Sequence, residues 1–189
     1  MIDLTFILNP VVGAIGGALI GTVLVRHFGI RERRRKSAWD LYKRYQDIDF
    51  RHIRSSVYTT SRNWGKSVED DEDIILWFLD IGRPHRIMKT EKNELNPYQN
   101  LSMMLYFWSE VCIGIRDKFI DKKLMKELFS YLYNTYSKFF DDFLIAYNNF
   151  LTNWKGNRTK YQIEYSDKPS IKPLWVTTIP LLKEQFREG

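Results

Sequence analysis

A single acidic residue inside an apolar segment is the first candidate for chemistry. Glu110 lies within the almost wholly apolar stretch 101–115. An unpaired carboxylate is costly to bury, so we expect it to be either protonated or paired with a cation. We predict a buried ion pair that fixes the register of two helices, with a ligand-binding or proton-sensing role as the alternative. The candidate partners are basic residues of the segment 37–64, namely Arg51, Arg54 and Arg62.

The same three arginines are interleaved with His52 and Trp64. Basic and aromatic side chains together can bind a phosphate or a nucleotide if they line a cleft between subunits. The alternative is a solvated helix face. The candidate ligand-binding residues are therefore Arg51, Arg54, Arg62 and Glu110.

No catalytic or metal-binding pattern is present. The histidines His27, His52 and His85 are scattered and lack metal-ligand spacing, and there is no Gly-x-Ser-x-Gly, phosphate loop or dinucleotide-binding glycine pattern. The lone Cys112 lies in an apolar segment, where a thiol is a poor nucleophile. The acidic run 69–73 lacks the spacing of a calcium loop and is typical of a helix start. We predict a protein that is not an enzyme and uses no cofactor or metal.

The positive charge is concentrated in one short segment. The chain has a net charge of +6, and residues 26–36 contribute six basic side chains and one acidic one. A basic segment beside a membrane is attracted to anionic headgroups, which makes nucleic acid an unlikely partner despite a pI near 9.3. The predicted membrane-surface residues are Arg26, Arg31, Arg33, Arg34, Arg35 and Lys36.

An uncharged stretch precedes this basic segment. Residues 4–25 carry no charge, and as a helix they would span roughly 33 Å, against about 30 Å for a bilayer core. Pro10 suits a first helical position, so we predict a span from Pro10 to about Phe28 within an anchor of residues 1–28. Arginines after the span place the N-terminus outside and the C-terminal domain in the cytoplasm.

Small residues recur along the predicted span. Gly13, Gly17 and Gly21 are spaced by four, which places them on one stripe of a helix where two backbones can approach closely. We predict that this stripe is a self-association face and that the protein is a homo-oligomer.

The remaining sequence predicts an all-α fold: the transmembrane helix, a basic juxtamembrane segment (29–36), a helical domain of about four helices (37–156) and a C-terminal tail (157–189). We expect helices over 37–64, from residue 67, over 97–116 and from Asp121 to about Trp154, with Gly156 as the stop. The segment 97–116 resembles a second span in hydropathy, but Glu110 and the lack of a basic flank favour a central core helix.

The tail contains Pro169, Pro173 and Pro180, which disfavour a long helix. Alternation of Tyr161, Ile163 and Tyr165 suggests a short extended piece. We expect the tail to wrap around the helices through Trp175 and to end in a short helix over 181–186.

Two short motifs resemble a family of uncharacterised bacterial proteins. These motifs are Phe107-Trp108-Ser109-Glu110 and, after the apolar helix, Lys118-Phe119-Ile120-Asp121. Members of that family have an N-terminal membrane helix, a basic junction and a small helical domain of unknown function; they tend to read Phe-Phe-Glu-Glu and Gly-Leu-Ile-Asp at these places. The resemblance covers about residues 36–155 and implies the topology, a helical fold and a bacterial cytoplasmic membrane, but no activity.

We therefore predict a single-pass, non-enzymatic, oligomeric interaction or effector module, such as a membrane effector of bacterial defence or stress. One alternative is a plain anchor that recruits a protein partner through the cytosolic domain or the tail segment 174–180. A second alternative is a nucleotide-sensing receptor that uses Arg51, Arg54 and Arg62.

Overall fold

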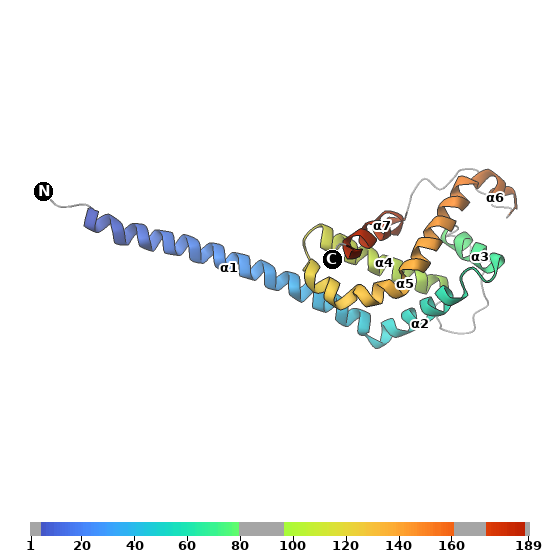
Figure 1. Ribbon diagram of the computed structural model, residues 1–189, viewed down its shortest axis with the longest axis horizontal. Helices are drawn as coiled ribbons and strands as arrows, with labels where there is room; N and C mark the ends of the chain where they lie inside the picture. The colour runs from blue at the N-terminus through green and yellow to red at the C-terminus, as the bar shows by residue number, and fades with distance from the viewer. Residues whose placement is uncertain (1–4, 80–96, 161–172, 188–189) are drawn as a thin grey trace.

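The computed structural model describes the backbone of residues 5–79, 97–160 and 173–187, and the side chains from residue 21 onward in these ranges except at positions 97, 158 and 187. All regular secondary structure in these ranges is α-helical, as predicted. The helices are α1 (Thr5–Gln46), α2 (Ile48–Asn63), α3 (Val68–Leu79), α4 (Pro97–Arg116), α5 (Lys122–Thr152), α6 (Trp154–Lys160) and α7 (Leu174–Arg187). The N-terminal part of α1 projects away from a bundle formed by its last turns and the other helices (Figure 1).

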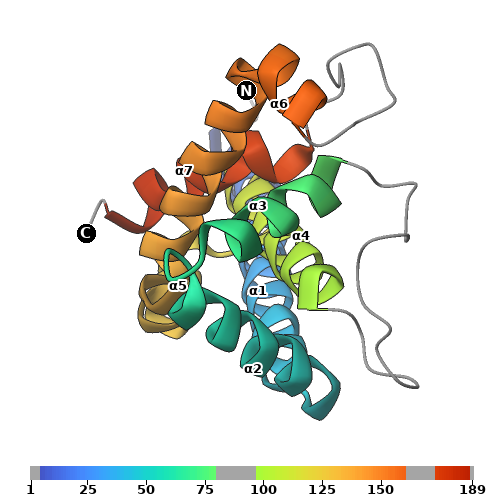
Figure 2. The same ribbon diagram turned by 90° about the vertical axis from the view of Figure 1, so that its right-hand side faces the viewer.

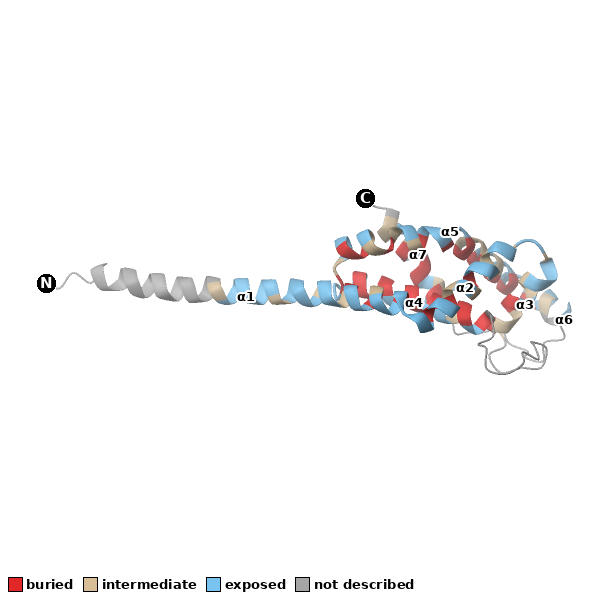
Figure 3. Ribbon diagram, turned by 90° about the horizontal axis from the view of Figure 1, so that it is seen from below, coloured by how far each residue is buried: buried red, intermediate tan, exposed pale blue. Residues whose placement is uncertain are grey.

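Helix α1 is continuous from Thr5 to Gln46 and includes the basic segment. The side chains from residue 21 to the bundle are mostly exposed (Figure 3). Within the part of the chain that the structure describes, no helix is both long and apolar enough to cross a bilayer. Most of the predicted span, with Gly13 and Gly17, falls in residues 1–20, outside the described side chains, so the span stays a prediction.

The helix predicted over 37–64 is divided at Asp47, so the expectation of one helix was wrong. Asp47 has an extended ψ of 148°, and its carboxylate accepts a hydrogen bond from the backbone N–H of Asp49 at 3.2 Å. An acidic side chain at this position satisfies a free N–H at the start of α2. The two helices can therefore change direction and bury Tyr45 and Phe50 against one another, with ring centroids 5.5 Å apart.

Helix α4 is the central helix of the bundle, as predicted. It packs most extensively against α7 and α2, and Figure 2 shows α1, α2, α3 and α5 along one side of it. Its buried face includes Leu101, Met104, Leu105 and Trp108, so the apolar stretch is explained by the core. The bundle has more helices than the four expected, because of the break at Asp47 and the additional helices α6 and α7.

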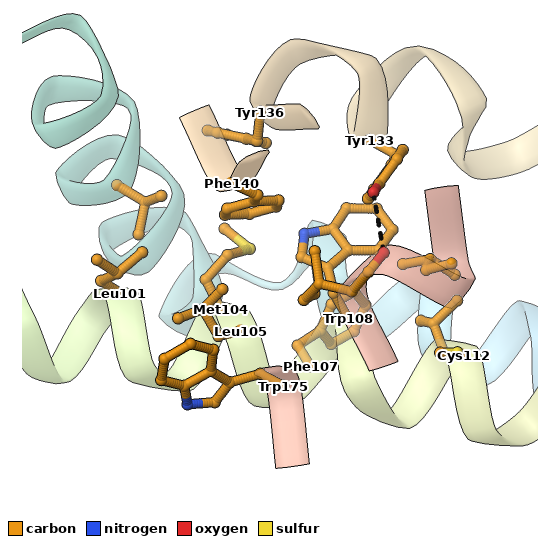
Figure 4. Packing of buried hydrophobic residues seen from close by; sticks show 14 of the residues in the cluster. Leu101, Met104, Leu105, Phe107, Trp108, Cys112, Tyr133, Tyr136, Phe140 and Trp175 are labelled. Atoms are coloured by element: carbon orange, nitrogen blue, oxygen red, sulfur yellow. Dashed lines mark hydrogen bonds between the residues drawn. The ribbon is translucent and has the colours of Figure 1, made fainter. Parts of the chain in front are cut away.

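Aromatic rings dominate the core around Trp108. The ring of Trp108 lies 5.2–6.4 Å from those of Tyr45 (α1), Phe129 and Tyr133 (α5), and Phe186 (α7). Figure 4 shows Trp108 beneath Tyr133 and beside Phe107. Edge-to-face and tilted pairs at such distances are favourable beyond their buried area. One side chain therefore joins four helices.

A buried pair of hydroxyl groups fixes α7 against α4. The Thr178 hydroxyl donates to Ser109 Oγ at 2.7 Å, and the Ser109 hydroxyl donates to the Leu105 carbonyl at 2.8 Å. Both side chains are buried. Two buried hydroxyl groups in an apolar interface are favourable only when they bond to each other. The pair therefore favours the one register of α7 against α4 that brings them together.

Helices α3 and α5 begin where the sequence predicted. The Ser67 hydroxyl accepts from the Asp70 N–H at 3.2 Å, and the acidic residues that follow lie in the first turn of α3. Asp121 caps α5 by accepting from the Leu124 N–H at 3.0 Å. Gly156, however, lies inside α6 and does not end α5; the break occurs at Asn153.

The tail forms a longer helix than expected. Helix α7 runs through Pro180 over 14 residues, whereas the prolines predicted only a short helix over 181–186. Pro180 is exposed, while Trp175, Ile179 and Leu182 are buried. Burial of this apolar face offsets the hydrogen bond that proline removes. The burial of Trp175 confirms that the tail packs on the bundle; the extended piece predicted at 161–165 lies outside the described residues.

We expect the hydroxyl pair to couple measurably in a double-mutant cycle. Ser109→Ala and Thr178→Val should each lower the free energy of unfolding by about 0.5–1.5 kcal/mol, and the double variant by less than their sum, because either single change already removes the hydrogen bond between the two hydroxyls, while the remaining hydroxyl keeps its bond to a carbonyl of its own helix. The measurement is chemical denaturation of the full chain in detergent. Thr177→Val is the matched control, because Thr177 is exposed and bonds only locally to Leu174; an additive double variant would contradict this interpretation.

Candidate functional site at the basic end of the bundle

The basic segment of α1 lies where this helix enters the bundle. Arg26, Arg31, Arg33, Arg35 and Lys36 are exposed, and Arg34 is partly buried. The first core residue of α1 is Ala38, which is fully buried. The segment therefore forms a charged collar between the projecting part of α1 and the core.

The turn between α4 and α5 meets this collar. The backbone N–H of Asp121 donates to the Arg34 carbonyl at 3.3 Å, which joins residues far apart in the sequence. A hollow of about 440 Å³ lies between the two segments. Its lining is mainly basic and consists of His27, Ile30, Arg31, Arg34, Asp121, Lys122 and Lys123. The Nε atom of Arg34 is buried and has no hydrogen-bond partner among the described residues.

The turn itself has a defined backbone conformation. Lys118 has a φ of +59°, in the left-handed region, and donates its N–H to Ile115 O at 3.2 Å, while Phe119 donates to Gly114 O at 2.9 Å. This pair of bonds is the Schellman ending of a helix, in which glycine normally occupies the left-handed position. The close packing of Ile120 on Gly114 leaves no room for a side chain at that glycine. Phe119 is consequently directed outward and is 69% exposed.

The turn adds positive charge to the collar. Residues 116–123 contain four basic and two acidic side chains, a net +2, while residues 26–36 have a net +5. Because the whole chain has a net +6, everything else sums to −1. Arg116 and Asp117 pair with one another at 2.7 Å, and the hydrogen bond from Arg116 lowers the pKa of the Asp117 carboxyl. The excess charge of the turn therefore comes from its three lysines.

Glu110 forms an ion pair, but with a different partner and in a different environment from those predicted. It binds Arg44 of α1 through two hydrogen bonds, at 2.5 and 3.3 Å, and the side chains of Arg44 and Glu110 are 47% and 53% exposed. The expectation of a buried pair with Arg51, Arg54 or Arg62 was wrong, because Glu110 lies on the solvent side of α4. The Arg44 guanidinium also lies 5.0 Å from the centre of the Phe107 ring.

This ion pair lies in a groove between α1 and α4. The groove has a volume of about 740 Å³, and it includes the partly exposed apolar side chains of Tyr106, Phe119 and Leu174. Asp40 and Ser37 complete its α1 side. The groove therefore combines partly exposed apolar side chains with a half-exposed bidentate ion pair.

The predicted ligand-binding residues do not lie close together. Arg51 and Arg62 are exposed on α2 and lie about 16 Å apart along the helix axis. Arg54 packs over the Tyr45 ring at 5.0 Å and donates to Gln46 at 3.1 Å. Burial raises the pKa of the Tyr45 phenol, which therefore stays protonated beneath this arginine. These contacts give Arg54 a structural role, and a binding role for the group stays a prediction.

The other candidates for chemistry are separated too. His27 lines the basic hollow, His52 is exposed on α2, and His85 lies outside the described residues. Cys112 is buried as predicted, and this burial raises the pKa of its thiol. Within the described ranges, no three His, Cys, Asp or Glu residues lie close enough to hold a metal ion.

Sequence reasoning missed the lysines and the phenylalanine of the α4–α5 turn. The distribution of charge along the sequence indicated only residues 26–36 as a basic segment. The available signal was Phe119 after Lys118 and just before the Asp121 cap, with two more lysines after the cap, at a turn where apolar residues are normally buried or absent. The contact between the Asp121 N–H and the Arg34 carbonyl joins residues far apart in the chain, and no local sequence pattern predicts it.

No protein-family model matches this chain, and neither the curated proteins nor the solved structures include a significant match. The resemblance to a bacterial membrane family therefore stays a prediction.

We expect the Arg44–Glu110 pair to contribute little to stability. Glu110→Gln should lower the free energy of unfolding by at most about 1 kcal/mol, because both side chains are half-exposed and screened by water and salt. The measurement is urea denaturation at low and high salt, with the reversed pair Arg44→Glu/Glu110→Arg as the control that restores the attraction. A loss of several kcal/mol, typical of a broken buried pair, would contradict the half-exposed geometry.

Proposed function

We propose that this chain is a single-pass protein of the bacterial cytoplasmic membrane that acts as a non-enzymatic, oligomeric interaction module. The predicted span would anchor it with the N-terminus outside and the helical bundle in the cytoplasm. The bundle would sense a signal or partner and pass the change to the spans, as a membrane effector of defence or stress would. The anchoring, the orientation and the oligomer are parts of this proposal.

The continuity of α1 is the observation that carries the proposal. The helix has 42 residues, which corresponds to roughly 63 Å. Its C-terminal turns contribute Ala38, Leu41 and Tyr45 to the core, while its N-terminal part carries the uncharged sequence of the predicted span. A continuous helix transmits rotation and tilt between its ends, whereas a plain tether would need only a loose linker.

The open surroundings of the described glycines support self-association. A side chain placed at Gly21 would meet no other atom of the protomer within 4 Å. Glycine inside a helix is unfavourable by about 1 kcal/mol relative to alanine, so the fold of one protomer gives no reason for it. Close approach of a second helix is a reason that fits the spacing of Gly13, Gly17 and Gly21.

The contacts of the candidate polar groups favour a role without catalysis. Glu110 is held by Arg44, Arg54 packs over Tyr45, and the Cys112 thiol is buried with a raised pKa. Each of these groups has a structural partner or environment, and none faces another candidate in a shared cleft. This supports an interaction module over an enzyme.

We expect substitutions in the glycine stripe to reduce the oligomer. Gly17→Leu and Gly21→Leu should convert a defined oligomer into smaller species, because a bulky side chain keeps the helices apart. The measurement is the mass of the full-length protein in lipid nanodiscs. Gly29→Leu is the matched control: Gly29 lies on the same helix but beyond Phe28, the predicted end of the span, with no atom of the protomer within 4 Å of an added side chain. A monomeric native protein, or an unchanged oligomer in the stripe variants, would contradict the proposal.

A recruiting anchor is the second candidate function, and the groove between α1 and α4 favours it. The tail segment 174–180, which the sequence suggests as a partner site, buries Trp175, Thr178 and Ile179 in the core. We therefore propose the groove with Tyr106 and Leu174 as the partner surface instead.

A Tyr106→Glu variant that loses a co-purifying partner but keeps its oligomeric mass would support this function over the first.

A further inference from the structure

We propose that the α4–α5 turn is a second lipid contact, in which Lys118, Phe119, Lys122 and Lys123 rest on the anionic headgroups beside the span. The turn would hold the bundle at a fixed tilt on the membrane, in addition to the anchor. This inference rests on the proposed membrane anchoring. It assigns a role to four residues that the charge distribution along the sequence did not single out.

The position of the turn along α1 suits this contact. The Asp121 N–H binds the carbonyl of Arg34, six residues after Phe28, the predicted end of the span. Six helical residues correspond to about 9 Å along the axis. The polar layer of a bilayer leaflet is about 5–8 Å thick, so the turn lies at the outer surface of the headgroup layer, where lysine and phenylalanine side chains can reach into it.

The chemistry of the turn matches an anionic lipid surface. Phe119 is one of the most exposed large apolar residues among those that the structure describes, and lysines precede and follow it. An aromatic side chain can enter the boundary between headgroups and acyl chains while neighbouring lysines bind phosphates. Each lysine close to such a surface strengthens attachment by about fivefold.

The backbone of the turn gives an independent argument. Lys118 has a φ of +59°, where glycine would be more favourable and where the fold gains nothing from a lysine side chain. Strained positions persist where another requirement outweighs the strain. A positive charge next to Phe119, directed at the membrane, is such a requirement.

The hollow between the turn and α1 provides a place for a headgroup phosphate. Its basic lining includes Arg31, Arg34 and Lys123, from both segments. Arg34 is only partly exposed, so its guanidinium is held in place at the edge of this hollow. Outside residues 26–36 and 116–123 the chain has a net charge of −1. The positive charge is therefore concentrated where these two segments meet, and this end of the bundle is complementary to an anionic leaflet.

Photocrosslinking of the full chain in nanodiscs tests this proposal. With p-benzoylphenylalanine in place of Phe119, irradiation should yield lipid adducts in nanodiscs that contain phosphatidylglycerol, and several-fold fewer in phosphatidylcholine alone. The same amino acid in place of Val68, which is 73% exposed on α3 at the far end of the bundle, should yield none. Equal yields at the two positions, or crosslinks from position 119 to a protein chain, would overturn the inference.

A third position for the photoreactive residue tests the membrane anchor independently of the second lipid contact. Val23 is 65% exposed and lies in the predicted span, so the photoreactive residue there reports insertion. Lipid adducts at position 23 but not at 119 would overturn only the second contact. No adducts at either position would overturn both the contact and the anchor.

Substitution of Lys118 distinguishes lipid binding from folding. Lys118→Gly should raise the melting temperature, because glycine favours the left-handed conformation, while it lowers the adduct yield at position 119 severalfold. Lys118→Arg should retain the yield, and Lys122→Gln with Lys123→Gln should reduce it further. An unchanged yield in the Lys118→Gly and the double glutamine variants would show that the lysines do not bind lipid.

Discussion

The position of Trp108 at the centre of α4 is the constraint on which the rest of the bundle depends. Its ring contacts aromatic side chains of α1, α5 and α7, and its own helix packs on α2. Rings have few rotamers and fill large volumes, so the helices that meet at this indole can do so at few angles. The direction in which α1 leaves the bundle is therefore set in the core, and the basic collar and the α4–α5 turn are brought together as a result.

Much of this fold could be predicted from local patterns. The apolar run of α4, the heptad-like spacing of α5, and the caps at Ser67 and Asp121 each identify an element through residues that lie close together in the chain. Such signals depend on helix periodicity and on the need to satisfy the first N–H groups of a helix. Trp175 was also expected to pack on the bundle, because a large apolar residue in a tail needs a partner surface.

The errors occurred where tertiary contacts outweighed local preference. Pro180 would end an isolated helix, but burial of Trp175 and Leu182 continues α7 past it. Glu110 lies in an apolar sequence yet faces solvent, because α4 is covered by neighbours on its other sides. The candidate site was predictable only in its α1 half: the arginines are consecutive in the sequence, whereas their approach to Lys122 and Lys123 follows from the packing of α4 and α5 against α1.

The unbroken course of α1 limits how the length of this chain can change in evolution. Each residue inserted between Gly21 and Ala38 would turn the bundle by about 100° relative to the membrane segment, and so present a different face to a neighbouring copy. Substitutions there leave this angle unchanged, whereas a single insertion or deletion does not. Changes of about seven, eleven or eighteen residues restore the original phase to within about 20°. Relatives that share this architecture should therefore conserve the length of α1 between these two points even where its exposed side chains differ.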